Sequence, residues 1–256
     1  MSAVPEAPRP FRLCALVPTY DNPDTIRRVA ERLRAHDLDV LVIDDGSAAA
    51  GREAVAALAR DGLARVRHRD RNGGKGAAVK TGLRFAVELG YTHALQIDAD
   101  GQHALEDVPR FCALAATHPD AVILGAPVFD ETAPAARRFG RRFTQMWTNL
   151  ETFGRVVHDP MCGFRVYPVQ AAVLADAWGD AMDFDPEIAV RLVWRGLPVM
   201  NVPTRVRYLT RSEGGVSHFR MFRDNALISW MHTRLVVGAI LLLLTGRARR
   251  REALLP

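Results

Sequence analysis

The sequence is poor in cysteine and in aromatic residues. Its three cysteines, at positions 14, 112 and 162 of 256 residues, form no C-x-x-C pair, so neither a zinc site nor a disulfide framework is indicated, and the thiols suit a reducing cytoplasm. Aromatic residues make up 7% of the chain, which leaves few stacking platforms for nucleic acid. Since no helix-turn-helix or zinc-finger pattern occurs either, nucleic acid is not an expected partner.

Two common nucleotide-binding signatures are also absent. No G-x-G-x-x-G follows the first apolar run, and the glycine-rich segment at residues 71–76 lacks the G-x-x-x-x-G-K-[ST] spacing of a P-loop. A dehydrogenase, a kinase and a P-loop NTPase are therefore disfavoured. A nucleotidyltransferase would usually carry a G-x-G-T-R-like loop near its start, and this chain has none.

The chain does contain a repeated alternation of apolar runs and amphipathic segments. Apolar runs predict strands at residues 13–17, 39–43, 64–67 and 93–97, and helical spacing predicts helices at residues 25–35, 53–60 and 77–89. Asp24 or Asn22 is the expected N-cap of the first helix. Repeated βα units of this kind predict an α/β fold with a mostly parallel sheet and helices on both faces.

The length and the lack of an internal linker predict one main domain. We expect it at residues 11–220, after a short disordered leader at residues 1–10 and before an apolar helix with an arginine-rich tail at residues 221–256. No Gly/Ser/Pro-rich stretch interrupts the middle of the chain, and its length suits one large α/β domain.

Acidic clusters follow three of the predicted strands. They are Pro18-Thr19-Tyr20-Asp21, Asp44-Asp45-Gly46-Ser47 and Asp98-Ala99-Asp100. Ligands of open α/β sheets bind beyond the carboxyl ends of the strands, and carboxylates gathered at that edge repel one another unless a cation or ligand is bound. Each cluster could also be an ordinary turn, because Asp and Gly are common turn residues.

The pair Asp98 and Asp100 is the clearest candidate for a metal site. Alternate residues of a strand point to opposite faces, so both carboxylates reach one ion only where the chain turns, and Gly101 permits that turn. Oxygen ligands suit Mg2+ or Mn2+, which complete their coordination with water and substrate phosphates. The pattern therefore predicts a metal-diphosphate site.

A glycine-rich loop and a second acidic strand end complete the predicted donor site. Residues 71–76, which include Gly74 and Lys75, lead into a helix and offer backbone N–H groups and a cation to a phosphate or nucleotide. Asp45 is placed to accept hydrogen bonds from a ribose or a base edge.

Four motifs, in their order and spacing, resemble those of family 2 glycosyltransferases with the GT-A fold: Val17-Pro-Thr-Tyr20, Asp44-Asp-Gly-Ser47, Asn72-Gly-Gly-Lys-Gly76 and Asp98-Ala-Asp100-Gly-Gln102. The resemblance covers residues 11–210 and is greatest to the dolichol- and polyprenyl-phosphate sugar synthases. It implies an inverting, metal-dependent transfer of a sugar from a nucleotide-diphosphate donor to a lipid-linked acceptor, most simply polyprenyl phosphate.

The resemblance also implies roles for individual residues. Asp100 would bind Mg2+ or Mn2+ directly, with Asp98 and Gln102 completing the site. Arg211 and Ser217 belong to a segment that is similar to the family's R-x-x-G-x-S loop over the donor diphosphate. Together with these two, the residues implied to hold the nucleotide sugar are Pro18, Thr19, Tyr20, Asp21, Asp45, Gly74, Lys75, Asp98 and Ala99. The family usually shows Asn-Glu after the aromatic residue of the first motif, where this chain has Asp21-Asn22.

The acceptor side offers three catalytic candidates, Asp159, Asp185 and Arg165. Residues 158–167 resemble the family's D-x-x-S/C-G-F-R segment, in which Asp159 has the position of a general base, and Asp185 with Asp183 opens a predicted helix where many relatives carry a base for hydroxyl acceptors. A phosphate acceptor needs no base, because its second pKa is about 6, and Asp159 would then orient the acceptor or Arg165.

Two alternatives to a polyprenyl-phosphate acceptor stay open at this point. The first is glycosyl transfer to a hydroxyl of a lipid or small molecule, which requires a base to remove the proton. The second, of another class, is a non-catalytic nucleotide-sugar binding module.

The C-terminal segment predicts peripheral contact with the cytoplasmic face of a membrane. Residues 235–244 form an unbroken run of apolar residues and glycine, whereas spanning a bilayer takes about 20 residues, and a longer window includes His232 and Arg234. We therefore expect an amphipathic helix at residues 222–244 in the interface, with the arginine-rich tail against anionic headgroups. Arginine pairs at 137–138 and 141–142 would receive a lipid phosphate. The alternatives are a buried core helix and a homodimer contact.

Overall fold

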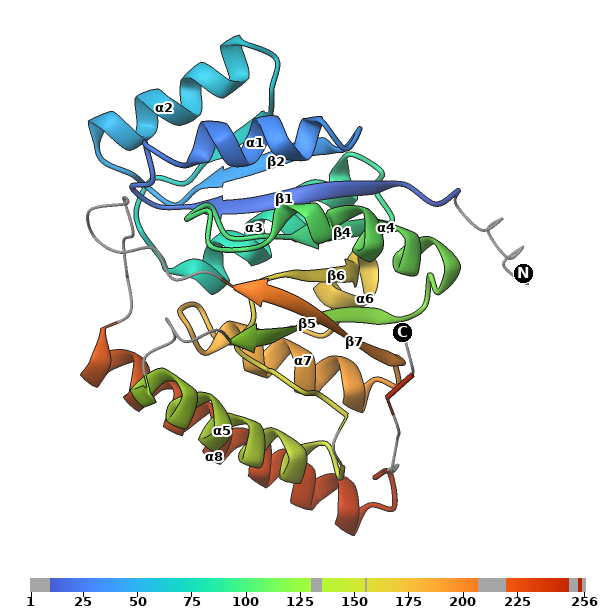
Figure 1. The fold of residues 1–256 in the computed structure, drawn as a ribbon. Coiled ribbons are helices and arrows are strands. Elements are labelled where there is room, and N and C mark those ends of the chain that lie inside the picture. Colours follow the sequence, from blue (N-terminus) through green and yellow to red (C-terminus); the bar gives the residue numbers. More distant parts are fainter. Residues whose placement is uncertain (1–9, 130–134, 155, 207–219, 249–252, 255–256) are drawn as a thin grey trace, which may run out of the picture.

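One seven-stranded sheet organises the computed structural model, which describes residues 10–129, 135–154, 156–206, 220–248 and 253–254 (Figure 1). The strand order is β3-β2-β1-β4-β6-β5-β7. The strands are β1 (Leu13–Thr19), β2 (Asp39–Asp44), β3 (Arg65–His68), β4 (His93–Gln96), β5 (Val122–Phe129), β6 (Arg165–Pro168) and β7 (Val199–Val206). All pairings are parallel except those of β6 with β4 and β5, which confirms the predicted mostly parallel sheet.

Helices cover both faces of this sheet. They are α1 (Ile26–Arg34), α2 (Ala49–Arg60), α3 (Lys75–Glu88), α4 (Val108–Thr117), α5 (Ala135–Glu151), α6 (Val169–Leu174), α7 (Phe184–Trp194) and α8 (Met221–Leu244), with a 3-10 turn at Leu105–Asp107. Along β1, Ala15 and Val17 join a buried cluster with α1, α2 and α4, whereas Cys14 and Leu16 join one with α3, α6 and α7. This alternation follows from the two-residue period of a strand.

The predicted elements of the first half are present, although some boundaries move. β1 continues through Pro18 to Thr19 instead of ending at residue 17, and α2 begins at Ala49 instead of residue 53. The N-cap predicted for α1 is wrong: the N-cap residue is Thr25, and its hydroxyl donates to Ala99 O at 2.6 Å. A contact with the loop after β4 takes the place of a local cap, because that loop lies against the start of α1.

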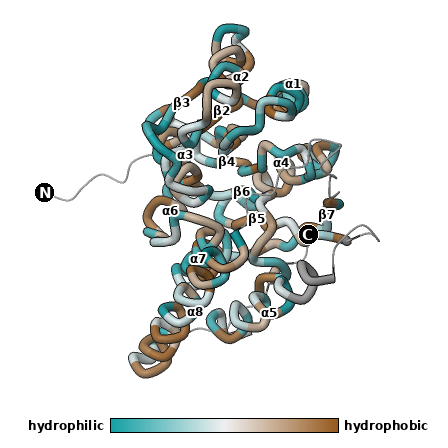
Figure 2. Tube along the Cα trace, turned by 90° about the vertical axis from the view of Figure 1, so that its left-hand side faces the viewer, coloured by the Kyte–Doolittle hydropathy of each residue, from teal (hydrophilic) through white to brown (hydrophobic). Residues whose placement is uncertain are grey.

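Two long helices form a further layer on the α7 side of the sheet. α5 and α8 lie side by side, and both contact α7 (Figure 1). Several of their large apolar side chains are exposed, namely Phe143, Met146 and Leu150 of α5 and Phe222, Trp230, Val237, Ile240, Leu241 and Leu244 of α8. In Figure 2 the hydrophobic colour of α8 is concentrated toward one end of the helix. By length and composition alone, α8 could cross a membrane.

Gly82 lets α3 lie close to the sheet. A Cβ atom at this position would lie 2.1 Å from Leu16 Cδ1 and 3.0 Å from Ile43 Cγ1. Gly140 on α5 is a matched helical control, because a Cβ atom there meets no described atom within 4 Å. Both Gly→Ala changes gain helix propensity, but only Gly82→Ala overpacks the core, which costs about 1–3 kcal/mol.

We expect the Gly82→Ala variant to have a free energy of unfolding about 1–3 kcal/mol below that of the Gly140→Ala variant, measured by urea denaturation. Equal free energies would contradict the close packing of α3 on β1.

Candidate active site

Lys75 joins three parts of the chain at the carboxyl edge of the sheet. It is the first residue of α3, after Gly74 with its φ of 102°, and its Nζ lies 2.7 Å from Asp98 Oδ1 and 2.8 Å from Asp185 Oδ2. Burial alone would lower the pKa of Lys75, but the two carboxylates outweigh it and raise that pKa. The pKa of Asp98 is lowered because Lys75 and His103 outweigh its burial. Lys75 and Asp98 therefore stay ionised as a compensated pair.

Asp185 is held at this point by a second set of contacts. Its Oδ1 accepts a hydrogen bond from Gln96 Nε2 at 3.1 Å, and Gln96 Oε1 in turn accepts one from the Tyr167 hydroxyl at 3.1 Å. All three side chains are buried. Gln96 and Tyr167 had no role in the interpretation of the sequence, although a glutamine inside an otherwise apolar strand is the signal that marks the first of them.

Arg165 supports the site from within the protein. It is fully buried, and its guanidinium donates to the backbone carbonyls of Asp185 at 2.6 Å and of Pro160 and Cys162 at 2.5 Å each. These bonds take up donors on all three nitrogens. Arg165 thus holds the backbone of Asp185 and of the turn at residues 160–162, and the catalytic role expected of it stays a prediction.

Gly163 brings the 158–167 segment against the Lys75–Asp98 pair. A Cβ atom at Gly163 would lie 2.3 Å from Asp98 Oδ2 and 2.6 Å from Lys75 Nζ. Since no side chain fits between them, the backbone of this segment forms one wall of the site.

Asp159 contacts α5 instead of Lys75. Both of its oxygens accept hydrogen bonds from Arg141 Nη1, at 2.7 and 2.6 Å, and its Oδ1 also accepts one from Met161 N at 2.8 Å. Of the two carboxylates proposed as a base, Asp185 is thus the one that shares Lys75 with Asp98. Arg141, predicted as a ligand of lipid phosphate, meets Asp159 directly, and Arg142 is exposed.

The Asp98–Asp100 turn has the predicted glycine geometry. Gly101 has a φ of 71°, and Asp100 Oδ1 accepts a hydrogen bond from Gln102 N at 3.0 Å. The pKa of Asp100 is raised by burial and by the negative charge of Asp98. A cation would relieve both effects, so the donor chemistry fits a hard divalent ion. Within the described part of the chain no three His, Cys, Asp or Glu side chains gather for a metal, so other ligands would have to come from water and substrate.

His103 is a neighbour of the site to which the sequence assigned no role. Its Nε2 lies 3.5 Å from Asp98 Oδ2, and its buried Nδ1 has no hydrogen-bond partner among the described residues. Its position directly after the D-x-D-G-Q motif is the signal that could have marked it.

The loops after β1 and β2 and the glycine loop are bound to one another. Asp45 accepts hydrogen bonds from Gly74 N at 2.8 Å and Gly73 N at 3.1 Å, and also from Arg69. Burial raises the pKa of Asp45 in spite of these donors. Asp21 Oδ1 accepts a hydrogen bond from Ala48 N at 2.8 Å, which joins the first two loops. Pro18, Thr19 and Tyr20 lie at the end of β1, on the same rim.

Arg211 and Ser217 lie outside the described residues, and their contact with a donor stays a prediction.

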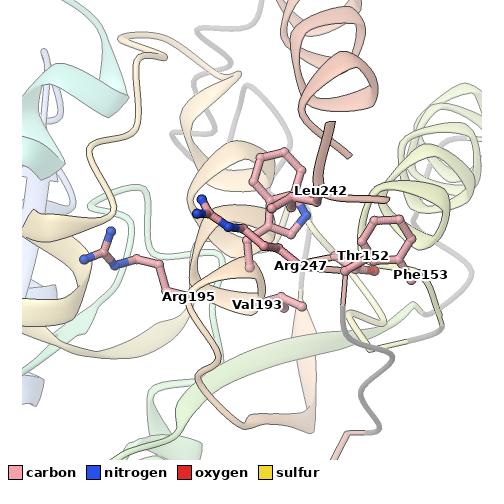
Figure 3. A pocket seen from close by; sticks show the side chains of 8 residues that line it. Thr152, Phe153, Val193, Arg195, Leu242 and Arg247 are labelled. Carbon is pink, nitrogen blue, oxygen red and sulfur yellow. The ribbon is translucent and has the colours of Figure 1, made fainter. Parts of the chain in front are cut away.

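A cavity of about 160 Å3 lies away from the Lys75–Asp98 pair, where α5, α7 and α8 end (Figure 3). Its lining residues are Thr152, Phe153, Val193, Trp194, Arg195, Leu242, Arg247 and Ala248.

The approach of Gly163 to Asp98 generates a prediction. We expect Gly163→Ala to abolish transfer activity while the protein stays folded, because the added methyl group would displace the Asp98 carboxylate or the Lys75 ammonium. Gly140→Ala, which meets open space, is the control and should keep full activity. The measurement is turnover of a nucleotide sugar alongside thermal unfolding, and full activity of Gly163→Ala would contradict the assignment of this wall.

Comparison with known proteins identifies the family of this chain. Residues 14–172 match the family model described as Glycosyl transferase family 2. The polyprenol monophosphomannose synthase of Mycolicibacterium smegmatis is 28% identical over 221 residues, which cover 80% of this chain and 80% of that protein. The undecaprenyl-phosphate mannosyltransferase of Micrococcus luteus is 36% identical over 103 residues, which cover 39% of this chain and 42% of that protein.

A solved structure shares the fold. The glucosyl-3-phosphoglycerate synthase of Mycobacterium tuberculosis, in complex with Mn2+, UDP-glucose and phosphoglyceric acid, matches with a TM-score of 0.62 and 15% identity over 90% of this chain and 79% of that one. This confirms the α/β fold of the GT-A type. The family model spans more than half of the chain, and the protein therefore belongs to glycosyl transferase family 2, as an enzyme that resembles the polyprenyl-phosphate sugar synthases.

Proposed function

We propose that this enzyme transfers a sugar, with inversion, from a nucleotide-diphosphate donor to polyprenyl phosphate. The observation that carries the acceptor assignment is the contact between Arg141 and Asp159. It links α5, which exposes Phe143, Met146 and Leu150, to the 158–167 segment that forms one wall of the Lys75–Asp98 site. A lipid-facing surface and the reacting centre are thereby adjacent. The names of the two mannosyl-transferring relatives support the same acceptor class.

On the donor side, we propose Mg2+ or Mn2+ held by Asp100, with Asp98 and Gln102 in support. A bound divalent cation stabilises the charge that develops on the leaving nucleotide diphosphate. The raised pKa of Asp100, caused by burial and by Asp98, supports Asp100 as the direct ligand. Asp98 would contribute less directly, because Lys75 already compensates its charge.

The rim loops would hold the nucleotide. Pro18 and Thr19 end β1, Tyr20 and Asp21 follow it, and Asp45 fixes the glycine loop through the N–H groups of Gly73 and Gly74. Ala99 is anchored through its carbonyl to Thr25. The donor would thus bind across loops that are already linked, which reduces the entropy lost on binding.

In the proposed reaction an acceptor phosphate oxygen attacks the anomeric carbon on the face opposite the diphosphate. The new carbon–oxygen bond forms as the bond to the diphosphate breaks, and the bonding electron pair leaves with the nucleotide. The acceptor phosphate is already ionised, so no base is required. Arg141 would bind this phosphate, and Asp159 would orient Arg141.

The second candidate is transfer to a hydroxyl group, with Asp185 as the base. Its place beside Lys75 and Asp98 favours this role. However, Asp185 Oδ1 already accepts a hydrogen bond from Gln96, and Oδ2 already pairs with Lys75, so a hydroxyl acceptor would have to approach this carboxylate beside both partners. The names of the two mannosyl-transferring relatives favour the phosphate acceptor. A binding module without catalysis has little support, because the chain belongs to an enzyme family and retains its carboxylates.

We further propose that α5 and α8 lie on the cytoplasmic face of a membrane. The exposed side of α8 includes Phe222, which is 90% exposed, and Leu244, which is 78% exposed. Its buried side carries His232 and Arg234, both in polar contacts with the protein, and charged groups are costly at the centre of a bilayer. This division favours a helix lying in the interface over one that spans it. A second copy of the chain covering the same side chains is the alternative.

A transfer assay tests the reaction. Purified protein with Mn2+ or Mg2+ is incubated with a panel of nucleotide sugars, with polyprenyl phosphate, with the dephosphorylated polyprenol, or with neither. We expect product only with polyprenyl phosphate and a metal, and we expect Asp100→Asn to abolish it. Asp120→Asn, at an exposed position after α4, is the matched control and should keep activity. Product from polyprenol alone would favour the hydroxyl acceptor, and unchanged turnover by Asp100→Asn would refute the metal assignment.

Flotation with anionic phospholipid vesicles tests the membrane contact. We expect the double variant Leu241→Gln/Leu244→Gln to bind vesicles at least about tenfold more weakly, because each exposed leucine contributes about 1–2 kcal/mol on burial. Leu174→Gln on α6, where the side chain is 52% exposed, is the control and should float normally. Normal flotation of the double variant, or its conversion from a dimer to a monomer without loss of flotation, would count against the lipid contact.

A further inference from the structure

The buried side of α8 carries an ion pair to the first turn of α7. Arg234 Nη1 and Nη2 lie 3.3 Å from Glu187 Oε1 and Oε2 respectively, and the Glu187 side chain is fully buried. A bidentate arginine–carboxylate pair restricts the relative position of the two helices. Burying such a pair contributes little net stability, so its main effect is to fix the position of α8 relative to α7.

Glu187 also holds the loop between α6 and α7. Its Oε2 accepts a hydrogen bond from Gly179 N at 2.8 Å, and Arg191 Nε donates to its Oε1 at 2.7 Å. Trp178 lies under the guanidinium groups of Arg234 and Arg191, at 4.9 and 5.6 Å from the ring centre. Burial alone would raise the pKa of Glu187, but the Gly179 N–H and Arg234 outweigh it and lower that pKa. The carboxylate thus stays charged at the junction of α7, α8 and this loop.

The same loop holds the start of α3, where Lys75 lies. Ala77 N donates to Asp180 O at 3.0 Å, and Lys80 Nζ lies 2.7 Å from Asp180 Oδ1. A Cβ atom at Gly74 would lie 2.4 Å from Asp180 O, and one at Gly76 would lie 2.4 Å from Phe184 Cβ. The first turn of α3 therefore packs tightly against the loop, and a displacement of the loop would move Lys75.

Asp185, the other partner of Lys75, lies in the same first turn of α7 as Glu187. A shift of Glu187 would therefore act on the Lys75–Asp185 contact from both sides, through the loop and through α7. The connection runs from the exposed apolar helix to the reacting centre entirely through contacts between described residues.

We propose that Arg234 is a positioning residue that couples the seating of α8 on a lipid surface to the placement of Lys75 and Asp185. The inference rests on the proposed function, since it takes α8 as the helix that meets the membrane. A lipid surface that orders α8 would, through Arg234 and Glu187, order the loop and the first turn of α3. The enzyme would then turn over faster where its lipid acceptor is present.

Amide hydrogen exchange tests the coupling without any substrate. We expect Arg234→Gln to speed exchange in peptides covering residues 75–80 and 175–181, because Glu187 loses a partner and the loop with the Gly179 amide and the Asp180 carbonyl, which accepts from Ala77 N, is held less firmly. Arg223→Gln removes an exposed charge from the same helix and should leave both peptides unchanged. In the wild-type protein, anionic vesicles without acceptor should slow exchange in both peptides, a result that needs no variant to fold.

Kinetics provide the second measurement, with a short-chain, water-soluble polyprenyl phosphate as acceptor. We expect vesicles to raise the wild-type kcat about fivefold or more, and Arg234→Gln to lose this rise while KM for the donor changes less than about twofold. Arg234→Lys should restore part of it, and flotation should confirm that all variants bind vesicles.

Two results would overturn the proposal. One is unchanged exchange at residues 75–80 and 175–181 when wild-type protein binds vesicles, and the other is normal vesicle stimulation of a folded Arg234→Gln variant. If no nucleotide sugar is transferred to polyprenyl phosphate at all, the proposed function fails, yet the exchange measurements still decide the coupling.

Discussion

The ammonium group of Lys75 lies between two carboxylates that belong to distant parts of the chain, Asp98 after β4 and Asp185 in the first turn of α7. Without the cation, the two carboxylates would face each other with no positive charge between them, and like charges repel strongly where water is largely excluded. Gly74 and Gly163 make this contact possible, because they let the backbone approach at points where no side chain fits. The loops at the carboxyl edge of the sheet and the 158–167 segment meet at this one ammonium group.

Around this centre, most of the rim carboxylates have partners within the protein. Asp21 binds the N–H of Ala48, Asp45 binds the glycine loop and Asp159 binds Arg141. Asp100 differs, because burial and its neighbour Asp98 raise its pKa, and the hydrogen bond that it accepts comes from the backbone N–H of Gln102. The electrostatic demand for a cation is therefore concentrated at Asp100, as expected of a ligand that receives a metal together with a diphosphate.

The outer layer of α5 and α8 adds a second kind of organisation. Each helix has an exposed apolar side and a buried side with an arginine that reaches a carboxylate near the site, Arg141 to Asp159 and Arg234 to Glu187. Amphipathic helices commonly pack through apolar contacts alone. Here one ion pair fixes α5 relative to the 158–167 segment, and another fixes α8 relative to α7. These two pairs connect the outer helices with the elements that carry the site.

The sequence by itself determined the βα order, the carboxyl rim and the D-x-D turn, because strand periodicity, glycine-bearing turns and ligand chemistry are local properties read from neighbouring residues. It could not show that Asp185 contacts Lys75 while Asp159 contacts Arg141, that Arg165 faces inward, or that Gln96, Tyr167 and His103 lie at the site. Those answers depend on how α5, α7 and the 158–167 segment pack against the sheet. Only the tertiary structure decided them, because contacts between residues 18 to 89 positions apart are set by the packing of whole elements and leave no periodic trace in the chain.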